Sequence, residues 1–307
     1  MKTFRFISAI LLATVFIVFN GCSKDDDNLE AAPTGSPIKK VELLVDGIPY
    51  LAAELSYSNS KPIKCKMYNP LLPLFYTDAY VSYQDNTIRI TSEDEGKGEG
   101  ENNYYWGKIN STLSFTYTLE NGHVSTCTLS SHYIAHDEDY ESEGEYYEYY
   151  EYKDGYLSHV TSNIEAEGKG TCTLDLTYYN GNLLKYEITN RFYSKATYIV
   201  TSSNIANKNN FPVELLTITT GIAGREDAEY IPLYASYLGI FGKTSAYLPQ
   251  KIEYSDEYGY ETINFTYEMD INGNITLIKI NKIERYGHGG WSNDHHDSND
   301  YSFKFSY

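Results

Sequence analysis

The side chains best suited to metal chemistry gather near the C-terminus of the sequence. Imidazole and carboxylate groups crowd into thirteen residues there: His288, Asp294, His295, His296, Asp297 and Asp300. Nitrogen and oxygen donors of this kind bind zinc and other divalent ions. Gly289 and Gly290 lie among them, so a mobile polar loop is the competing interpretation. We treat the first five of the six as a candidate divalent-cation site, and no other cofactor is predicted.

The two tryptophans, Trp106 and Trp291, are the candidate ligand-binding aromatics. Both stand in segments rich in glycine and asparagine, and Tyr104 and Tyr105 precede the first of them. Flat aromatic rings beside polar groups offer stacking surfaces for a sugar. The chain has 33 tyrosines against 12 phenylalanines. For most of these tyrosines a structural role is the alternative, since cross-strand aromatic pairs stabilise a sheet by about 0.2 to 1 kcal/mol each.

Two acidic runs and a histidine pair carry weaker signals. Asp137–Glu151 and Ser92–Asn103 are dense in carboxylates, and hard cations need several carboxylate oxygens at one point. The glycine that an EF-hand calcium loop needs at its sixth position is absent, so we predict solvated loops, the first running into a tyrosine-rich strand. His132 and His136 have the spacing of helical zinc ligands but fall in a predicted strand.

Motifs for familiar catalytic chemistry are absent. The sequence contains no nucleophile elbow, Walker loop or dinucleotide fingerprint. Its acidic residues are too many to single out a glycosidase pair, which would need two carboxylates about 5 to 10 Å apart in a cleft. The sequence therefore predicts a non-enzymatic protein, with a polysaccharide hydrolase as one alternative.

Alternation of side chains dominates the sequence from residue 39 onward. Between Thr112 and Leu119, threonine and serine alternate with leucine, phenylalanine and tyrosine, which is the period of a half-buried strand. Pairs of Asn or Asp with Gly, suited to tight hairpins, recur between such stretches: Asp46-Gly47, Asn121-Gly122, Asp154-Gly155, Asn180-Gly181 and Asn272-Gly273. Successive hairpins make an antiparallel meander, and a sheet of more than about ten strands must curl, split or close. We predict a single all-β domain over 39–307, strongly curved or barrel-like.

One segment departs from the strand pattern. Within Glu229–Phe241 the apolar residues follow three-four spacing, Pro232 lies near the start, and Gly242 follows the end. These are the signals of a helix and its two ends. We predict one short helix here, covering an end or a face of the sheet.

The first residues indicate export. Lys2 and Arg5 precede an uncharged apolar stretch of 14 residues, Phe6–Phe19, which is shorter than the roughly 20 needed to span a bilayer and typical of a signal peptide. Asn20-Gly21-Cys22 resembles the lipobox of bacterial lipoproteins, whose cysteine is lipidated and becomes the new N-terminus. We predict a signal peptide over 1–21, lipidation of Cys22, and a flexible acidic tether over 22–38. A plain secretory leader is the alternative.

The net charge limits the classes of partner, and the number of cysteines limits the possible disulfides. Removal of the leader takes the formal charge from −18 to −20, which repels nucleic acid and leaves neutral glycans, proteins or metal cations as partners. Cys65, Cys127 and Cys172 can form at most one disulfide. Cys127 and Cys172 lie in matching Thr-Cys-Thr-Leu strings, so neighbouring strands could place them together. We favour the alternative, in which both are small buried strand residues.

Several strings together carry a family resemblance. Ser23–Asp27 resembles the acidic tract that directs Bacteroidetes lipoproteins to the outer face of the outer membrane. With the glycine turns, the strings that match are Tyr237-Leu238-Gly239, Gly242-Lys243-Thr244-Ser245 and Tyr247-Leu248-Pro249. The chain resembles a group of uncharacterised Bacteroidetes surface lipoproteins whose domain of unknown function is porin-like in fold. The resemblance implies that fold over most of 39–307 and supplies no catalytic residues.

The observations favour a lipid-anchored cell-surface protein that binds a glycan or a surface protein through loops or a concave sheet face. An outer-membrane-embedded barrel or pore is the second possibility, because the last strand alternates aromatic with polar residues as such barrels do: Tyr301, Phe303, Phe305 and Tyr307 with Ser302, Lys304 and Ser306. Against it, Ser, Thr and Lys recur in many strands where lipid requires an apolar band. The ligand, the strand order and closure of the sheet are not fixed by the sequence.

Overall fold

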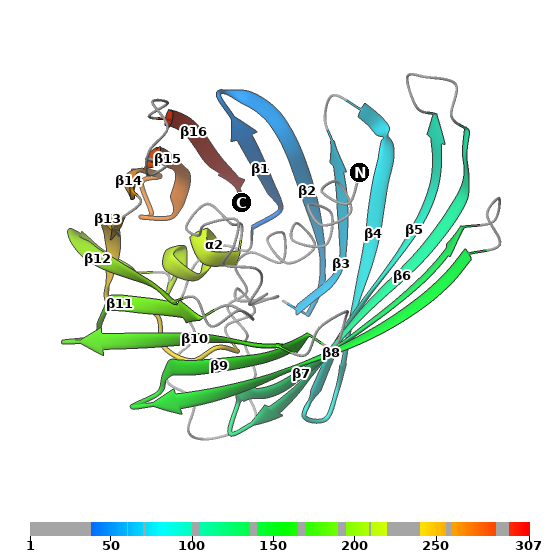
Figure 1. Cartoon of the computed structure of the whole chain (residues 1–307), viewed down its shortest axis with the longest axis horizontal. Coiled ribbons are helices and arrows are strands. Elements are labelled where there is room, and N and C mark those ends of the chain that lie inside the picture. Colours follow the sequence, from blue (N-terminus) through cyan, green and yellow to red (C-terminus); the bar gives the residue numbers. More distant parts are fainter. Residues whose placement is uncertain are drawn as a thin grey trace.

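A computed structural model of the chain describes residues 38–59, 61–69, 72–99, 105–135, 140–164, 170–189, 195–208, 210–219, 240–255, 259–286 and 295–307. Sixteen antiparallel strands form one sheet that closes on itself as a barrel (Figure 1). The predicted all-β class and the hairpin meander are confirmed. Within the described ranges, no helix is both long and apolar enough to cross a membrane.

The strands follow one another around the wall in chain order. Their bounds are β1 (Lys40–Val45), β2 (Ile48–Ser58), β3 (Lys61–Asn69), β4 (Leu72–Gln84), β5 (Thr87–Glu99), β6 (Tyr105–Glu120), β7 (His123–Ala135), β8 (Tyr140–Lys153), β9 (Tyr156–Ile164), β10 (Gly170–Tyr179), β11 (Asn182–Thr189), β12 (Lys195–Ala206), β13 (Tyr247–Ser255), β14 (Gly259–Met269), β15 (Ile275–Tyr286) and β16 (His295–Ser306). A short helix, α2 (Val213–Thr219), lies in the connection between β12 and β13.

Pairing of the first strand with the last closes the barrel. Val41 of β1 lies opposite Phe305 of β16, and Leu43 lies opposite Phe303. Closure removes the free edges that would otherwise expose unpaired backbone groups. The sequence left this point open.

The predicted glycine turns form tight hairpins. At four of the five predicted pairs, the residue before the glycine and the glycine itself both have positive φ, as at Asp154 (56°) and Gly155 (81°). Such backbone favours Asn, Asp and Gly. The fifth pair, Asn272-Gly273, lies in a turn held by Asp270, whose carboxylate accepts bonds from the backbone N–H groups of Asn272 at 2.8 Å and Asn274 at 2.9 Å.

Apolar side chains point to the interior and polar ones to the outside. On β6, Phe115 and Tyr117 are buried whereas Thr118 is exposed. The buried face is the inner one, because Tyr117 packs edge-on against Phe241, and Phe305 packs against Phe211, both from the β12–β13 connection. Figure 1 shows α2 of this connection inside the ring of strands.

The β12–β13 connection closes one end of the barrel. Its residues 240–246 take part in backbone bonds with three places on the wall: Ile240 accepts from Val124 at 2.8 Å, Lys243 donates to Gly155 at 2.8 Å, and Ala246 donates to Gly181 at 2.9 Å. We call this the closed end. It also holds the β14–β15 turn, the start of β1 and the end of β16. The opposite one is the far end, where β6 and β16 begin.

Two predicted acidic loops need correction, and most of the predicted helix lies outside the described residues. The helix predicted over Glu229–Phe241 lies outside the described residues except for Ile240 and Phe241, which are not helical, and the described helix α2 was not foreseen. The acidic runs were predicted as loops, but β8 occupies 140–153 and β5 continues to Glu99. Carboxylates on the outer face of a strand are solvated there, so their density does not prevent pairing.

Candidate functional site

The predicted ligand residues that the structure describes belong to the far end. Tyr105 and Trp106 begin β6, and His295 to Asp297 begin β16. The strand order places β6 six strands from β16 along the wall, which is about 29 Å at a spacing of about 4.8 Å. The two sets therefore share an end of the barrel without being neighbours in the sheet.

The other predicted site residues lie outside the described residues: Cys22, Tyr104, Trp291, His288 and Asp294. Among the described residues, no group of three or more His, Cys, Asp or Glu side chains is arranged to hold a metal ion. His132, the described member of the histidine pair, lies on β7 as predicted.

A row of side chains crosses the inner wall toward the far end. Each member lies opposite the next on the neighbouring strand: Tyr186, Tyr198, Tyr254, Glu261 and Glu284. We call this set the inner row. Tyr186 and Tyr198 stack with ring centroids 4.7 Å apart, and Tyr198 stacks on Tyr254 at 5.1 Å. Burial raises the pKa of Tyr186, with Tyr198 and Glu261 adding to the effect, so this phenol stays uncharged.

Lys282 balances the two carboxylates of the inner row. Its ammonium group forms ion pairs with Glu284 and, at 3.8 Å, with Glu261. All three side chains are largely buried, and buried charges need such compensation. A glycosidase needs its two carboxylates on either side of a substrate. Here one ammonium group contacts both, so the cluster is suited to holding charge in place rather than to acid–base catalysis.

Glu148 is a buried acid elsewhere on the inner wall. The Tyr150 hydroxyl donates a hydrogen bond to its Oε2, while Oε1 has no hydrogen-bond partner. Burial raises the pKa of Glu148 to about 8, and the bond from Tyr150 opposes this shift. The side chain is therefore mostly protonated near neutral pH, which reduces the cost of leaving it in an apolar surround.

Three cysteines, Cys65, Cys127 and Cys172, lie in the described part of the chain, where they are buried and form no disulfide. Cys127 lies opposite Glu148, which lies opposite Ser162, which lies opposite Cys172. Two strands separate Cys127 from Cys172, so they do not lie on neighbouring strands, and the favoured interpretation of two buried strand residues without a disulfide is confirmed. Burial also raises the pKa of the Cys127 and Cys65 thiols, which keeps both in the less reactive thiol form.

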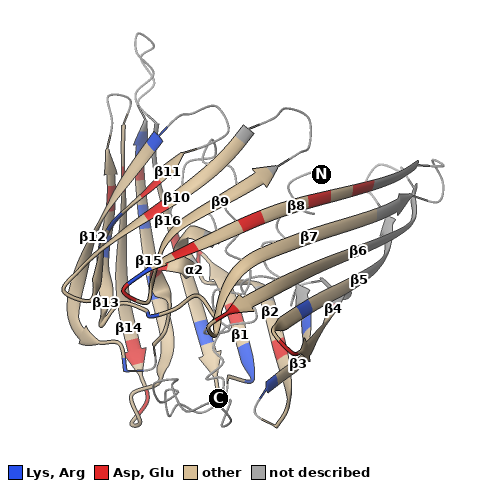
Figure 2. Cartoon of the chain, turned by 90° about the horizontal axis from the view of Figure 1, so that it is seen from below, with Lys and Arg blue, Asp and Glu red and all other residues tan. Residues whose placement is uncertain are grey.

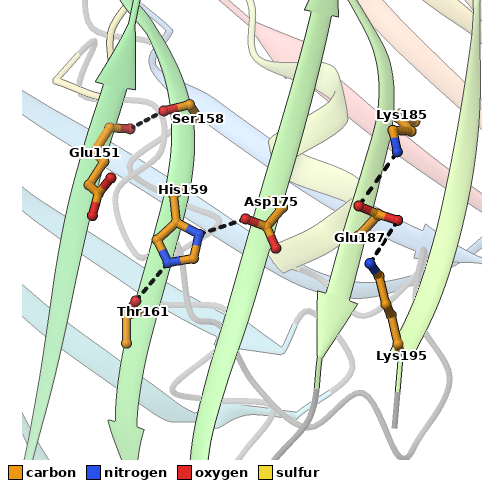
Figure 3. A network of polar contacts seen from close by, with 8 residues as sticks. All are labelled: Glu151, Ser158, His159, Thr161, Asp175, Lys185, Glu187 and Lys195. Atoms are coloured by element: carbon orange, nitrogen blue, oxygen red, sulfur yellow. Dashed lines mark hydrogen bonds and ion pairs between the residues drawn. The ribbon is translucent and has the colours of Figure 1, made fainter. Parts of the chain in front are cut away.

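Polar ladders cover the outer face between β8 and β12 (Figure 3). His159 Nδ1 lies 2.7 Å from Asp175 Oδ1, and its Nε2 lies 2.9 Å from Thr161 Oγ1. Further around the wall, Glu187 forms ion pairs with Lys195 at 3.0 Å and Lys185 at 3.5 Å. The His159–Asp175 and Glu187–Lys195 contacts link neighbouring strands, while the other two lie within one strand, and all of these side chains are partly solvated.

The Thr161–His159–Asp175 arrangement has the order of a catalytic triad but not its surroundings. A triad also needs donors for the oxyanion and a concave site. These residues lie on a strand surface whose described backbone N–H groups are committed to the β8–β9–β10 ladders. The arrangement therefore serves as a cross-strand polar contact.

Polar outward residues recur on other described strands of the wall. On β14 the outward Asn264, Thr266 and Glu268 alternate with inward apolar residues, and on β16 Ser302 and Lys304 do the same. Figure 2 shows charged residues of both signs along the strands, including β8 and β16. The described outer face thus lacks the uncharged apolar band, roughly 25 Å tall, that a lipid-facing barrel carries.

Sequence reasoning missed the buried charges. Glu148, Glu261 and Lys282 stand in phase with apolar neighbours, as in Glu261-Thr262-Ile263-Asn264-Phe265. That phase was a usable signal, because period two assigns Glu261 to the same face as Ile263 and Phe265.

Comparison with known proteins supports the fold. No family model matches the chain, and no curated protein sequence matches it. Among solved structures it is similar to a porin-like protein from Bacteroides uniformis, with a TM-score of 0.54, 19% identity, and coverage of 88% of this chain and 97% of that one. A porin-like protein from Bacteroides vulgatus gives a TM-score of 0.53 and 15% identity, covering 88% of this chain and 98% of that one. The predicted porin-like fold is confirmed.

Proposed function

We propose that the protein is a lipid-anchored envelope barrel, held at the outer membrane by Cys22, whose wall stands in water and whose role is non-enzymatic ligand binding. The polar outer face supports a wall in water. Placing Lys279 or Lys304 against hydrocarbon would cost about 2 to 4 kcal/mol for each cation at the bilayer midplane, and the outward Glu268 would add a smaller cost. The lipobox-like string supplies the attachment.

The observation that carries the binding role is the separation of the two ends. At the closed end, residues 240–246 are held against the wall by backbone hydrogen bonds at three places. The strands that carry the predicted ligand residues Tyr105, Trp106 and His295 all begin at the far end. Apart from the β12–β13 connection, most of the connections longer than a tight turn lie at the far end, and loops at one end of a rigid wall are a common arrangement for binding sites.

Neutral glycans are the ligand class we favour. The formal charge of −18 disfavours anionic ligands. Trp106 and Trp291 would stack on sugar rings, and the tyrosine-rich strands add rings with polar tips. A protein of the cell surface that presents neutral glycans is the related partner.

The test is a glycan array followed by calorimetric titration of the strongest hit. We expect Trp106→Ala together with Trp291→Ala to abolish binding, while Tyr179→Ala, an exposed aromatic of the closed end, leaves it intact. An array with no hit, or a double variant that binds as well as the parent, would remove the glycan proposal.

An outer-membrane-embedded barrel is the second candidate. The closed sixteen-stranded wall and the likeness to porin-like structures favour it. The outward lysines, glutamates and threonines weigh against it, and behaviour without detergent discriminates the two.

A further inference from the structure

The closed end gathers features that suit contact with a lipid surface. Ile271, at the tip of the β14–β15 turn, is fully exposed. Its turn is rigid, since Asp270 also accepts a bond from the Asn274 side chain at 2.8 Å and exchanges backbone bonds with Gly273 and Asn274. Met269 nearby is more than a third exposed, and Tyr179 at the same end is 67% exposed. The hydrogen bonds of this turn hold the Ile271 side chain in solvent, where it packs against no other part of the described fold.

Charge differs between the two ends. In the sequence of the chain start, the turns with their flanking residues and the β12–β13 connection, which together make up the closed end, seven basic residues accompany eight acids: Lys39, Lys40, Lys61, Lys153, Lys208, Arg225 and Lys243 with Asp85, Glu120, Asp154, Glu214, Glu226, Asp227, Glu229 and Asp270. The connections of the far end, with their flanking residues, contain eleven acids and three basic residues in the sequence. The far-end set therefore has a formal charge of −8 and the closed-end set one of −1, so the closed end is the less acidic of the two and the one that phosphate-bearing headgroups would repel less.

The chain enters the barrel at the closed end through a fixed point. Ile38 is fully buried, and its carbonyl accepts a hydrogen bond from the Tyr57 hydroxyl. Lys39 donates its backbone N–H to Ser306 at 2.7 Å. Figure 2 shows the C-terminus at the same end as the start of β1. Whatever precedes Ile38 is thus attached to this end of the wall.

The length of the preceding segment selects the orientation. Sixteen residues separate Cys22 from Ile38, and a flexible linker of that length spans about 20 to 24 Å on average. β16 has 12 residues, so it is about 40 Å long and rises about 30 Å at a tilt of about 40°. The average span of the linker is thus shorter than the height of the wall. The closed end therefore stays nearer to the anchored cysteine than the far end does.

We propose that the closed end rests on the phosphate-bearing lipid surface to which the protein is anchored, with Ile271 inserted among the headgroups and the far end directed away from the membrane. The proposal rests on the lipid anchor at Cys22 proposed above. It goes beyond the anchor by assigning an interaction surface and an orientation, which places the glycan-binding end toward the medium.

The test uses the full, lipidated chain in vesicles of phosphatidylcholine and phosphatidylglycerol. Ile271→Cys and Ile48→Cys each provide one exposed thiol for an environment-sensitive fluorophore, because the three cysteines of the barrel are buried. Ile48 is the matched control, since it is an exposed isoleucine at the far end. Parent protein treated with the same reagent measures labelling at other sites. The readout is quenching by lipids that carry a spin label near the headgroup.

We expect quenching at position 271 to exceed that at position 48 several-fold. Equal quenching at the two positions, or stronger quenching at position 48, overturns the orientation while the anchor stands. If the chain fails to float with the vesicles, the anchor itself fails, and both proposals fall. Flotation therefore separates the two failures.

Discussion

Substitution of Glu148 by glutamine is expected to reverse its effect on stability between pH 5 and pH 8. The pKa of this buried carboxyl is raised from 4.5 to about 8. Between those values the folded protein keeps a proton that the unfolded chain releases, so the stability that Glu148 supplies is present below pH 4.5 and lost as the pH rises toward 8. At 1.36 kcal/mol for each tenfold change, the loss is less than about 1 kcal/mol at pH 5 and roughly 4 kcal/mol at pH 8.

Glu148→Gln removes this ionisation and little else. The amide oxygen can still accept the bond from Tyr150, while the amide nitrogen takes the place of Oε1, which has no partner. An unsatisfied buried donor costs about 1 to 3 kcal/mol. After subtracting the loss that the parent itself shows at each pH, we therefore expect the variant to be less stable than the parent at pH 5 by up to about 2 kcal/mol, and more stable at pH 8 by about 1 to 3 kcal/mol.

Urea unfolding of both proteins at pH 5, 6.5 and 8 measures the difference. Glu145→Gln is the matched control, because Glu145 is exposed on the outer face of the same strand, and we expect it to change stability little at any of these pH values. A difference between parent and Glu148→Gln that stays constant from pH 5 to pH 8 would refute the assigned burial of Glu148.

Three further perturbations test the packing. Gly242→Ala places a Cβ 2.4 Å from the Gly155 carbonyl oxygen at a φ of +80°, so thermal unfolding should show a loss of stability of more than about 3 kcal/mol. Gly47→Ala is the control, because its φ is +76° but nothing lies within 4 Å of the added Cβ. This variant should lose only the roughly 1 to 2 kcal/mol of stability that left-handed backbone strain costs. Lys282→Met removes the ammonium group that pairs with two buried carboxylates, so urea unfolding should show a loss of stability of about 3 to 5 kcal/mol. Lys279→Met on the solvated face is the control and should cost at most about 1 kcal/mol. Equal losses in the two variants would contradict the buried cluster. The three barrel cysteines, buried and unpaired, should resist a thiol reagent in the native protein and react in denaturant, and rapid native labelling would show that the wall opens.

Local signals account for most of what the sequence predicted correctly. Period two and the five glycine turns depend on neighbouring residues alone, so strands and hairpins could be assigned without knowing the tertiary structure. Closure of the barrel could not be predicted in this way, because it depends on the pairing of Val41 with Phe305 at the other end of the chain. A sheet of many strands can also curl or split, and composition does not choose among these outcomes.

The errors have physical causes too. α2 has seven residues, too few for a helical period to stand out, and it is stabilised by packing inside the barrel rather than by its own propensity. Glu148 was hidden within an acidic run, and only its phase with Tyr150 distinguished it from outward carboxylates such as Glu145. The candidate ligand residues remain predictions, since fold and register place the strands that carry them without showing what they bind.

The most direct test of the central claim is the state of the Cys22→Ala protein in the absence of detergent. The barrel core faces inward and its outer wall is polar, so we expect this variant to leave the membrane fraction and to run as a monodisperse species in size-exclusion chromatography with aqueous buffer. Retention of the variant in the membrane fraction, with release only by detergent, would contradict a wall that stands in water.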